Sequence, residues 1–315
     1  MVEQNEKSSE TFESNRIARR HRVDIQQMMN KQSIRRRLLD KIATGVAMAC
    51  VIAAIIPLGS ILTEVVKNGA AALSLEFLTQ PPGAIGSGSG GIGPAIQGTL
   101  IVIALASLIG APVGILAGIY LSEFAGSGRF PYAVRFLNDV LTGLPSIVVG
   151  IVGFTVIVLT IGSFSVWAGA FALSIIMVPI VVRVTEETLK LVPNSIREAG
   201  YSLGIPKWKV VMFIVLTSAK SGVLTGIVLA LSRIAGETAP LIMTILGTSL
   251  FFTGFADPVD ALPLRIWRLA SQPYESAHSF GWGAALILII LVLAMSVGLR
   301  MLAYKKGFRI KTMSI

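Results

Sequence analysis

The stretch SGVLTGIVLALSRIAGETAPLIMTILG, residues 221–247, is apolar except for a few small polar residues and two charged ones, Arg233 and Glu237. A helix needs about 20 apolar residues to cross the hydrocarbon core of a bilayer, so this stretch predicts a membrane span. A charge near the bilayer centre costs about 2.5–3.5 kcal/mol on insertion scales. The two charged residues therefore need an explanation.

Arg233 and Glu237 stand at positions i and i+4, which places them on one face of a continuous helix. Two interpretations follow. The pair neutralises itself and is merely tolerated by the membrane, or it belongs to a pathway for an anionic solute. In the second case Arg233 offers a planar fork of donors to the anion, and Glu237 holds that fork and adjusts its net charge.

The whole composition is that of a membrane protein with several spans. Of 315 residues, 53% are hydrophobic and 14% charged, and the mean hydropathy is +0.75. The formal net charge is +10, but the basic residues cluster beside apolar spans, a pattern that indicates membrane orientation rather than nucleic-acid binding. The single cysteine, Cys50, excludes an intrachain disulfide.

The apolar segments predict an all-α integral membrane protein with six spans. We expect a polar, basic tail over 1–41, a six-helix membrane domain over 42–305 and a short basic tail over 306–315. The expected spans are 42–66, 95–121, 136–160, 165–184, 221–247 and 281–303. The third and fourth are separated by a short Gly/Ser turn and should form a hairpin.

The distribution of Lys and Arg predicts that both termini are cytoplasmic. That orientation places 23 of the 27 on the inner side and three, Lys67, Arg265 and Arg268, on the outer side. Residues 16–39 form either part of a solvated tail or a basic helix on anionic lipid.

Glycines and prolines give the spans internal features. The second span carries a small-xxx-small ladder that permits close helix packing, so this helix should lie inside the bundle: Gly110, Gly114 and Gly118. Four prolines are expected to interrupt the spans: Pro112, Pro145, Pro179 and Pro240.

The sequence gives little support for catalytic or metal-dependent chemistry. The glycine-rich run 83–94 lacks the Gly-Lys-Ser/Thr of a phosphate-binding loop and is expected to be a connector. The only histidines, His21 and His278, have no cysteine partner for a metal site. Asp139, near the inner end of the third span, is expected to be a helix-packing or snorkelling group. We therefore expect no catalytic residue, metal or cofactor on this chain.

The long inner loop, residues 184–220, predicts a short helix, a sharp turn and a second helix. Asn194 or Ser195 can cap the first helix, since Glu198 follows Ser195 at capping-box spacing. Gly204 and Pro206 then end it. A loop of this length indicates docking to a soluble partner.

This loop resembles the EAA loop of ABC-importer permeases, whose pattern is Glu-Ala-Ala, three residues, Gly, nine residues, Ile-x-Leu-Pro. The matching positions are Glu198, Ala199, Gly200, Gly204, Ile214 and Leu216; Gly200 and Thr217 depart from the pattern. The resemblance implies that the helix around 195–204 couples to an ATPase subunit, with Glu198, Ala199, Gly200 and Gly204 at that contact. Gly204 would allow close backbone approach there.

Further segments resemble the permeases of phosphate-specific ABC importers, the A-type subunit more than its sister. They are GGIGPAIQGTL (90–100), NDVLTGLPSIVVGIVGF (138–154), SRIAGETAPL (232–241) and DALPLRIWRLASQP (260–273). The resemblance covers about 34–305. It implies the type I ABC importer permease fold and a role in phosphate translocation for Arg233, Glu237 and Thr238.

The resemblance also implies the assembly. The chain would pair with the sister permease PstC as a heterodimer, above two copies of the ATPase PstB, which bind ATP and Mg. An external phosphate-binding protein, PstS, would dock on outer loops 67–94 and 248–280, where 260–270 is expected to form an amphipathic helix bearing Arg265, Trp267 and Arg268. Three alternatives remain: a permease for sulfate, molybdate or phosphonate, an ion-coupled secondary transporter, and an intramembrane enzyme.

Overall fold

The computed structural model describes residues 36, 39–84, 89–126 and 128–307. The remaining parts of the expected tails, 1–35, 37–38 and 308–315, lie outside this description. The chain divides into two units, 1–63 and 64–315. The first contributes most of the helix Leu39–Ala70, and the second holds the packed helices that follow it in the chain.

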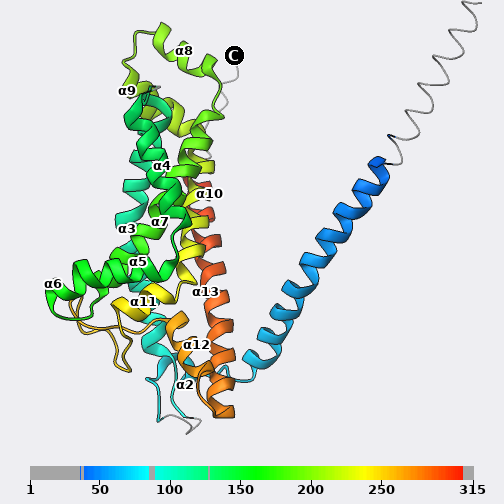
Figure 1. The fold of residues 1–315 in the computed structure, drawn as a ribbon, viewed down its shortest axis with the longest axis vertical. Helices are drawn as coiled ribbons and strands as arrows, with labels where there is room; N and C mark the ends of the chain where they lie inside the picture. The colour runs from blue at the N-terminus through cyan, green and yellow to red at the C-terminus, as the bar shows by residue number, and fades with distance from the viewer. Residues whose placement is uncertain (1–35, 37–38, 85–88, 127, 308–315) are drawn as a thin grey trace, which may run out of the picture. The chain divides into compact units, whose positions relative to one another are not determined.

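Helices account for nearly all regular structure in the described residues, which contain two isolated bridges but no strand (Figure 1). Segments η1, η2 and η3 are π-helical turns. In chain order the elements are α2 Leu75–Thr79, α3 Gly93–Ile119, η1 Tyr120–Phe124, α4 Arg129–Gly143, α5 Ser146–Gly153, η2 Phe154–Val158, α6 Leu159–Ile161, α7 Val166–Lys190, α8 Asn194–Ser202, α9 Lys207–Lys209, η3 Val210–Val215, α10 Leu216–Ala235, α11 Ala239–Thr244, α12 Leu262–Ala270 and α13 Glu275–Gly307.

Five described helices are long and apolar enough to cross a membrane: Leu39–Ala70, Gly93–Phe124, Val166–Lys190, Lys207–Ala235 and Glu275–Met301. A sixth crossing is possible if the pair Arg129–Gly143 and Ser146–Ile161, bent by 104°, forms one broken span. The all-α prediction is confirmed. Two of the six expected spans, 136–160 and 221–247, have a different course.

The expected third span is broken at Leu144 and Pro145. Leu144 has an extended backbone (ψ 136°), as a residue before proline prefers, and it ends α4. A new helix, α5, begins after Pro145 and turns aside from the bundle (Figure 1). Pro112 and Pro179, by contrast, lie inside the continuous helices α3 and α7, so the prediction that they interrupt their spans is wrong.

The expected span over 221–247 is also wrong. The helix begins earlier, at Lys207, and ends at Ala235 with Gly236 as its C-cap. Pro240 explains the end, because its ring would clash with the carbonyl of Gly236 in a continued helix and it offers no N–H. The loop expected over 184–220 is correspondingly shorter, since α7 runs to Lys190 and the next span starts at Lys207.

The core of the bundle is the contact between α3 and α7. A Cβ at Gly114 would lie 2.7 Å from Val181 Cβ, and one at Gly118 would lie 2.7 Å from Thr185 Cβ. Only glycine permits this backbone approach, so the predicted packing role of the ladder is confirmed. The predicted hairpin also forms, because α5 packs on α7 and Gly162 turns the chain with φ +81°.

Replacing Gly114 by leucine is expected to destabilise the protein by about 1–3 kcal/mol, the usual cost of overpacking a core. The matched control is Gly298→Leu on α13, since nothing lies within 4 Å of a Cβ at that position. Thermal unfolding of both variants in one detergent measures the difference. Equal melting temperatures for the two would show that α3 and α7 do not pack as closely as described.

Candidate functional site

Arg233 and Glu237 meet at the end of α10 rather than in the middle of a helix. Arg233 lies in the last turn, and Gly236 caps it through hydrogen bonds from its N–H to the carbonyls of Arg233 and Ile234. Glu237 follows the cap, and its carboxylate Oε1 lies 3.1 Å from Arg233 Nη2. The predicted shared helix face is therefore wrong, although the two charges do form an ion pair.

The two partners differ in burial. The Glu237 side chain is 10% exposed and the Arg233 side chain 62% exposed. The buried carboxylate thus anchors a guanidinium that is otherwise largely exposed in the described structure. Within a membrane span such a group needs protein or water around it, since hydrocarbon cannot solvate its charge. This face of the described structure is therefore unsuited to lipid contact.

Arg233 also borders the break between α4 and α5. A small cavity of about 50 Å³ has Arg233 in its lining, together with Thr142 on one side of the break and Ser146 on the other. Pro179 of α7 lines it as well. The two hydroxyl residues were not among the predicted site residues, although Pro145 between them was a visible signal of a break.

Thr238, the third predicted pathway residue, follows Glu237 directly. It occupies the N-cap position of α11, makes no side-chain capping bond and is half-buried. Its carbonyl accepts a hydrogen bond from the N–H of Ile242, at 3.1 Å. The structure thus brings Arg233, Glu237 and Thr238 together where two helices end and begin.

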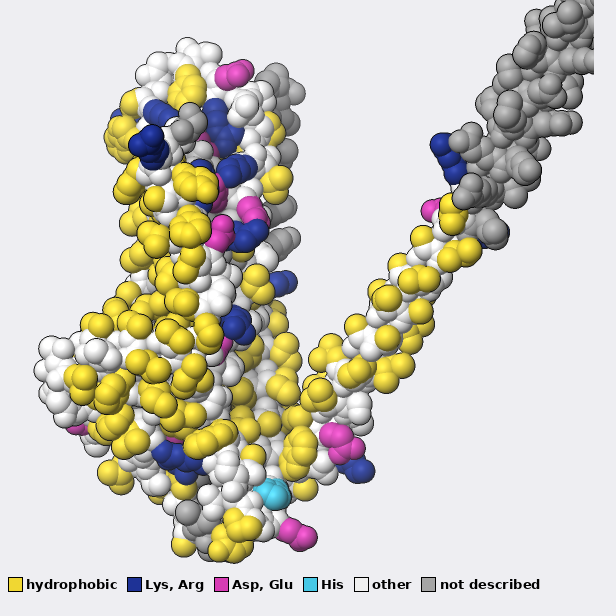
Figure 2. All heavy atoms as spheres, viewed as in Figure 1, with side chains coloured by type: hydrophobic (Ala, Val, Ile, Leu, Met, Phe, Trp, Pro, Cys, Tyr) yellow, Lys and Arg dark blue, Asp and Glu magenta, His cyan; other side chains and the backbone are white. Residues whose placement is uncertain are grey.

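The second group of predicted residues lies on α8, which projects at one end of the bundle (Figure 1). Glu198 and Ala199 are exposed, whereas Gly200 is buried against the bundle. The helix begins after Pro193 without a side-chain cap, so the capping box predicted for Asn194 or Ser195 is wrong. Charged side chains are frequent at this end of the visible face, and hydrophobic ones dominate its middle (Figure 2).

The glycines of this segment have different roles. Gly204 adopts φ +72° and has no atom within 4 Å of its Cβ position, so it turns the chain after α8, as predicted. Gly200 supplies a close approach within the chain itself, because its Cβ would lie 2.9 Å from Val210 Cγ2 of η3. The departure from Ala at this position of the EAA pattern therefore has a packing reason.

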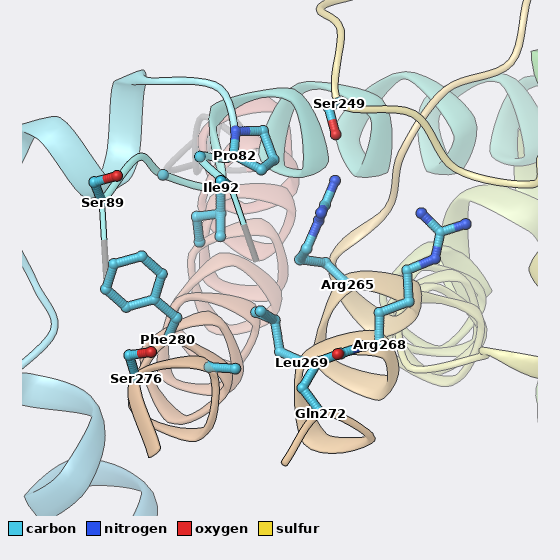
Figure 3. Close-up of a pocket in the computed structure, with 14 residues that line it drawn as sticks. Pro82, Ser89, Ile92, Ser249, Arg265, Arg268, Leu269, Gln272, Ser276 and Phe280 are labelled. Carbon is cyan, nitrogen blue, oxygen red and sulfur yellow. The ribbon is translucent and has the colours of Figure 1, made fainter. Parts of the chain in front are cut away.

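The amphipathic helix expected over 260–270 is α12, but its arginines are not simply presented to solvent. Arg265 is buried and forms an ion pair with the fully buried Asp260. Burial raises the pKa of the Asp260 carboxyl, and the Arg265 charge opposes that rise. Arg268 donates to the carbonyl of Leu246. Both arginines line a cavity of about 390 Å³ between α12 and α13 (Figure 3).

The other titratable residues noted in the sequence make local contacts. Asp139 Oδ1 lies 3.7 Å from Arg183 Nη1, and both side chains are largely exposed. His278 Nε2 lies 2.7 Å from the carbonyl oxygen of Gln272, and His21 is outside the described residues. In the part of the chain that the structure describes, no group of three or more His, Cys, Asp or Glu is placed to hold a metal ion.

Comparison with known families matches residues 110–308 to the family described as "Binding-protein-dependent transport system inner membrane component". The phosphate transport system permease protein PstA of Yersinia pestis is 39% identical over 293 residues, covering 92% of this chain and 98% of that protein. PstA of Xylella fastidiosa is 42% identical over 274 residues (85% and 93%). A probable PstA of Methanocaldococcus jannaschii is 39% identical over 268 residues (84% and 94%).

Solved structures share the fold at low sequence identity. A bacterial alginate ABC transporter chain, crystallised with an alginate-bound periplasmic protein, aligns with TM-score 0.61 and 16% identity over 85% of this chain and 96% of that chain. A chain of the MetNI methionine ABC transporter, in an inward-facing conformation, aligns with TM-score 0.54 and 16% identity over 68% and 93%. The helical arrangement is thus that of ABC importer permeases.

Proposed function

This chain belongs to the binding-protein-dependent transport system inner membrane component family and, within it, to the PstA phosphate permeases, and we propose how its residues serve phosphate import. It is a transport subunit of the membrane, not an enzyme, and it forms half of the path for inorganic phosphate in an ATP-driven importer. The observation that carries the residue-level proposal is the exposed guanidinium of Arg233, held by buried Glu237.

Arg233 is proposed to bind phosphate during its passage. A guanidinium matches a phosphate oxygen pair with two parallel charge-assisted hydrogen bonds. Glu237 holds one side of the group and reduces its net charge, so that the anion is attracted and also released. Thr238, next in the chain, would add a hydroxyl donor to the path. The location of all three at the end of α10 supports this assignment.

The coupling proposal concerns α8 and requires cytoplasmic termini. Glu198 and Ala199 would contact the ATPase, and their exposure supports that role. Gly200 and Gly204 would shape the segment, Gly200 by packing it on the bundle and Gly204 by turning the chain. ATP and Mg would be bound by the ATPase, and this chain would bind no cofactor.

An importer of this family needs a permease partner and an ATPase. We propose PstC as the sister permease, two copies of PstB as the ATPase and PstS as the external phosphate-binding protein. The outer loops 67–94 and 248–280 would receive PstS. Their position supports this, because α2 and α12 lie at the opposite end of the bundle from α8 (Figure 1).

The cycle follows from these contacts. Closure of the two ATPase subunits on ATP displaces α8. This displacement rocks the helices attached to α8 and opens the phosphate path outward. Phosphate then passes from PstS to the face that carries Arg233. Hydrolysis reverses the displacement, and the anion leaves toward the cytoplasm.

The test is uptake of radiolabelled phosphate by proteoliposomes that contain the whole reconstituted complex. We expect uptake to require ATP and to be competed by unlabelled phosphate but not by sulfate, molybdate or a phosphonate. Competition by one of these other anions would reassign the substrate. Uptake driven by an ion gradient without ATP would instead indicate a secondary transporter.

A further inference from the structure

One arginine of α8 faces inward and is engaged at every donor. Arg197 Nε and Nη2 lie 3.1 and 2.6 Å from the two carboxylate oxygens of Glu123. Nη2 also donates to the carbonyl of Leu189 at 2.8 Å. Nη1 donates to the carbonyl of Val192 at 2.5 Å and to the side chain of Asn194 at 3.3 Å. A guanidinium has five N–H donors, so each finds an acceptor.

This ion pair is nearly closed to solvent. The side chain of Arg197 is 13% exposed and that of Glu123 is 5% exposed. The hydrogen bonds to Glu123 raise the pKa of Arg197 above its ordinary value. A pair of this kind has a fixed geometry, and losing one partner leaves a buried charge without compensation. It is unlike the exposed ion pairs of a surface, whose contribution is small.

Two of these acceptor residues, Glu123 and Leu189, belong to the ends of two long helices, whereas Val192 and Asn194 lie in the linker and at the start of α8. Glu123 lies in η1, the π-helical continuation of α3, and Leu189 lies in the last turn of α7. The same two helices pack along their lengths through the Gly110, Gly114 and Gly118 ladder. Arg197 therefore joins α8 to a pair of helices that are themselves closely packed.

The other attachment of α8 is apolar. Gly200 packs against Val210 of η3, and Ile196 and Ile214 pack against the buried hydrophobic cluster to which Val210 belongs. Apolar contacts are not directional, so they permit sliding between helices. The three hydrogen bonds of Arg197 to Glu123 and Leu189 specify both distance and direction. Beside them, Lys207 Nζ lies 5.1 Å from the ring centre of Phe124.

We propose that the Arg197–Glu123 pair is the joint through which a displacement of α8 moves α3 and α7 as one body. The proposal rests on the assigned role of α8 in contacting the ATPase. Arg197 is thus a positioning residue, since it touches neither phosphate nor ATP. Glu198, its neighbour, is exposed and would serve the contact with the ATPase.

The decisive variant replaces both partners by apolar side chains of similar size, Arg197→Met with Glu123→Leu. Replacing a buried ion pair in this way often preserves or raises stability, so the complex should assemble and keep its melting temperature. The directional link is nevertheless lost. We expect ATP hydrolysis to continue while phosphate imported per ATP falls about tenfold. Glu123→Gln alone should show the same uncoupling with lower stability.

A purely structural role makes the opposite prediction for the double variant. If the double variant has both the wild-type stability and the wild-type ratio of phosphate imported to ATP hydrolysed, the proposed role of the pair as a joint is refuted. A second readout does not depend on phosphate. Spin labels at Ser202→Cys and Gly126→Cys, in a Cys50→Ala background, report the distance from α8 to the end of α3. ATP should leave this distance unchanged in the parent and change it in the double variant.

These readouts separate the two proposals. If the parent complex hydrolyses ATP without importing phosphate, the assigned substrate fails, while the label distances still test the joint. If the parent imports phosphate and the label distance responds to ATP in the same way in the parent and in the double variant, the proposed joint is refuted and the assigned function stands.

Discussion

Arg233→Gln is expected to reduce phosphate uptake by about 10- to 150-fold, while ATP hydrolysis by the assembled complex continues. The estimate corresponds to the roughly 1.5–3 kcal/mol that a hydrogen bond to a charged group contributes. The fold should survive, because the Arg233 side chain is mostly exposed in this subunit and a glutamine amide can still donate to the buried Glu237 carboxylate. The measurement is initial uptake of radiolabelled phosphate in proteoliposomes, with ATP hydrolysis recorded in the same samples.

Two companion variants sharpen this result. Arg233→Lys keeps the charge but loses the planar fork, so uptake should remain impaired if two parallel hydrogen bonds matter. Arg300→Gln on α13 makes the same kind of change at another exposed arginine and should leave uptake near the wild-type value. Normal uptake by Arg233→Gln would make its pair with Glu237 structural and would remove the main support for a pathway at this position.

The sequence was sufficient to predict the helical class and most spans. Hydrophobic length alone located the helices now seen at Gly93–Phe124 and Val166–Lys190. The spacing of Gly110, Gly114 and Gly118 predicted a tightly packed helix, and the structure places α7 against it. These signals are reliable because span length and small-residue ladders depend on local composition.

The course of the chain at two prolines could not be obtained from hydrophobicity. Pro145 and Pro240 end helices, while Pro112 and Pro179 do not. All four stand in apolar surroundings. The difference depends on whether neighbouring helices accommodate the freed carbonyls, which is a tertiary property. The expected span over 221–247 therefore ran past the true end of α10 at Ala235.

The candidate site shows the same division. Intramembrane charge singled out Arg233 and Glu237, and the structure confirms their ion pair. The difference in burial between these two side chains, and the proximity of Thr142 and Ser146 to Arg233, could be seen only in the folded structure. No sequence pattern could pair Arg197 with Glu123, because 74 residues separate them.

Glu198→Ala is expected to uncouple the importer without disturbing its fold. The Glu198 carboxylate is exposed and makes no hydrogen bond or ion pair to the described part of the chain, so its removal should change stability by less than about 0.5 kcal/mol. If it forms a buried, hydrogen-bonded charge pair with the ATPase, truncation should weaken that contact by about 2–5 kcal/mol. ATP-dependent uptake and co-purification of the ATPase should then both decline.

The neighbouring Ser195→Ala is the matched control, since Ser195 is also exposed on α8 and lies outside the EAA pattern. It should preserve uptake, ATPase binding and melting temperature. Because Glu198 is exposed whereas the adjacent Arg197 is nearly buried in its pair with Glu123, their variants should also fail differently. Glu198→Ala should release the ATPase, whereas Arg197→Met with Glu123→Leu should retain it and lose the transmission of movement. Retention of the ATPase and full uptake by Glu198→Ala would place the contact elsewhere on α8 and leave its exposed face without the role assigned to it.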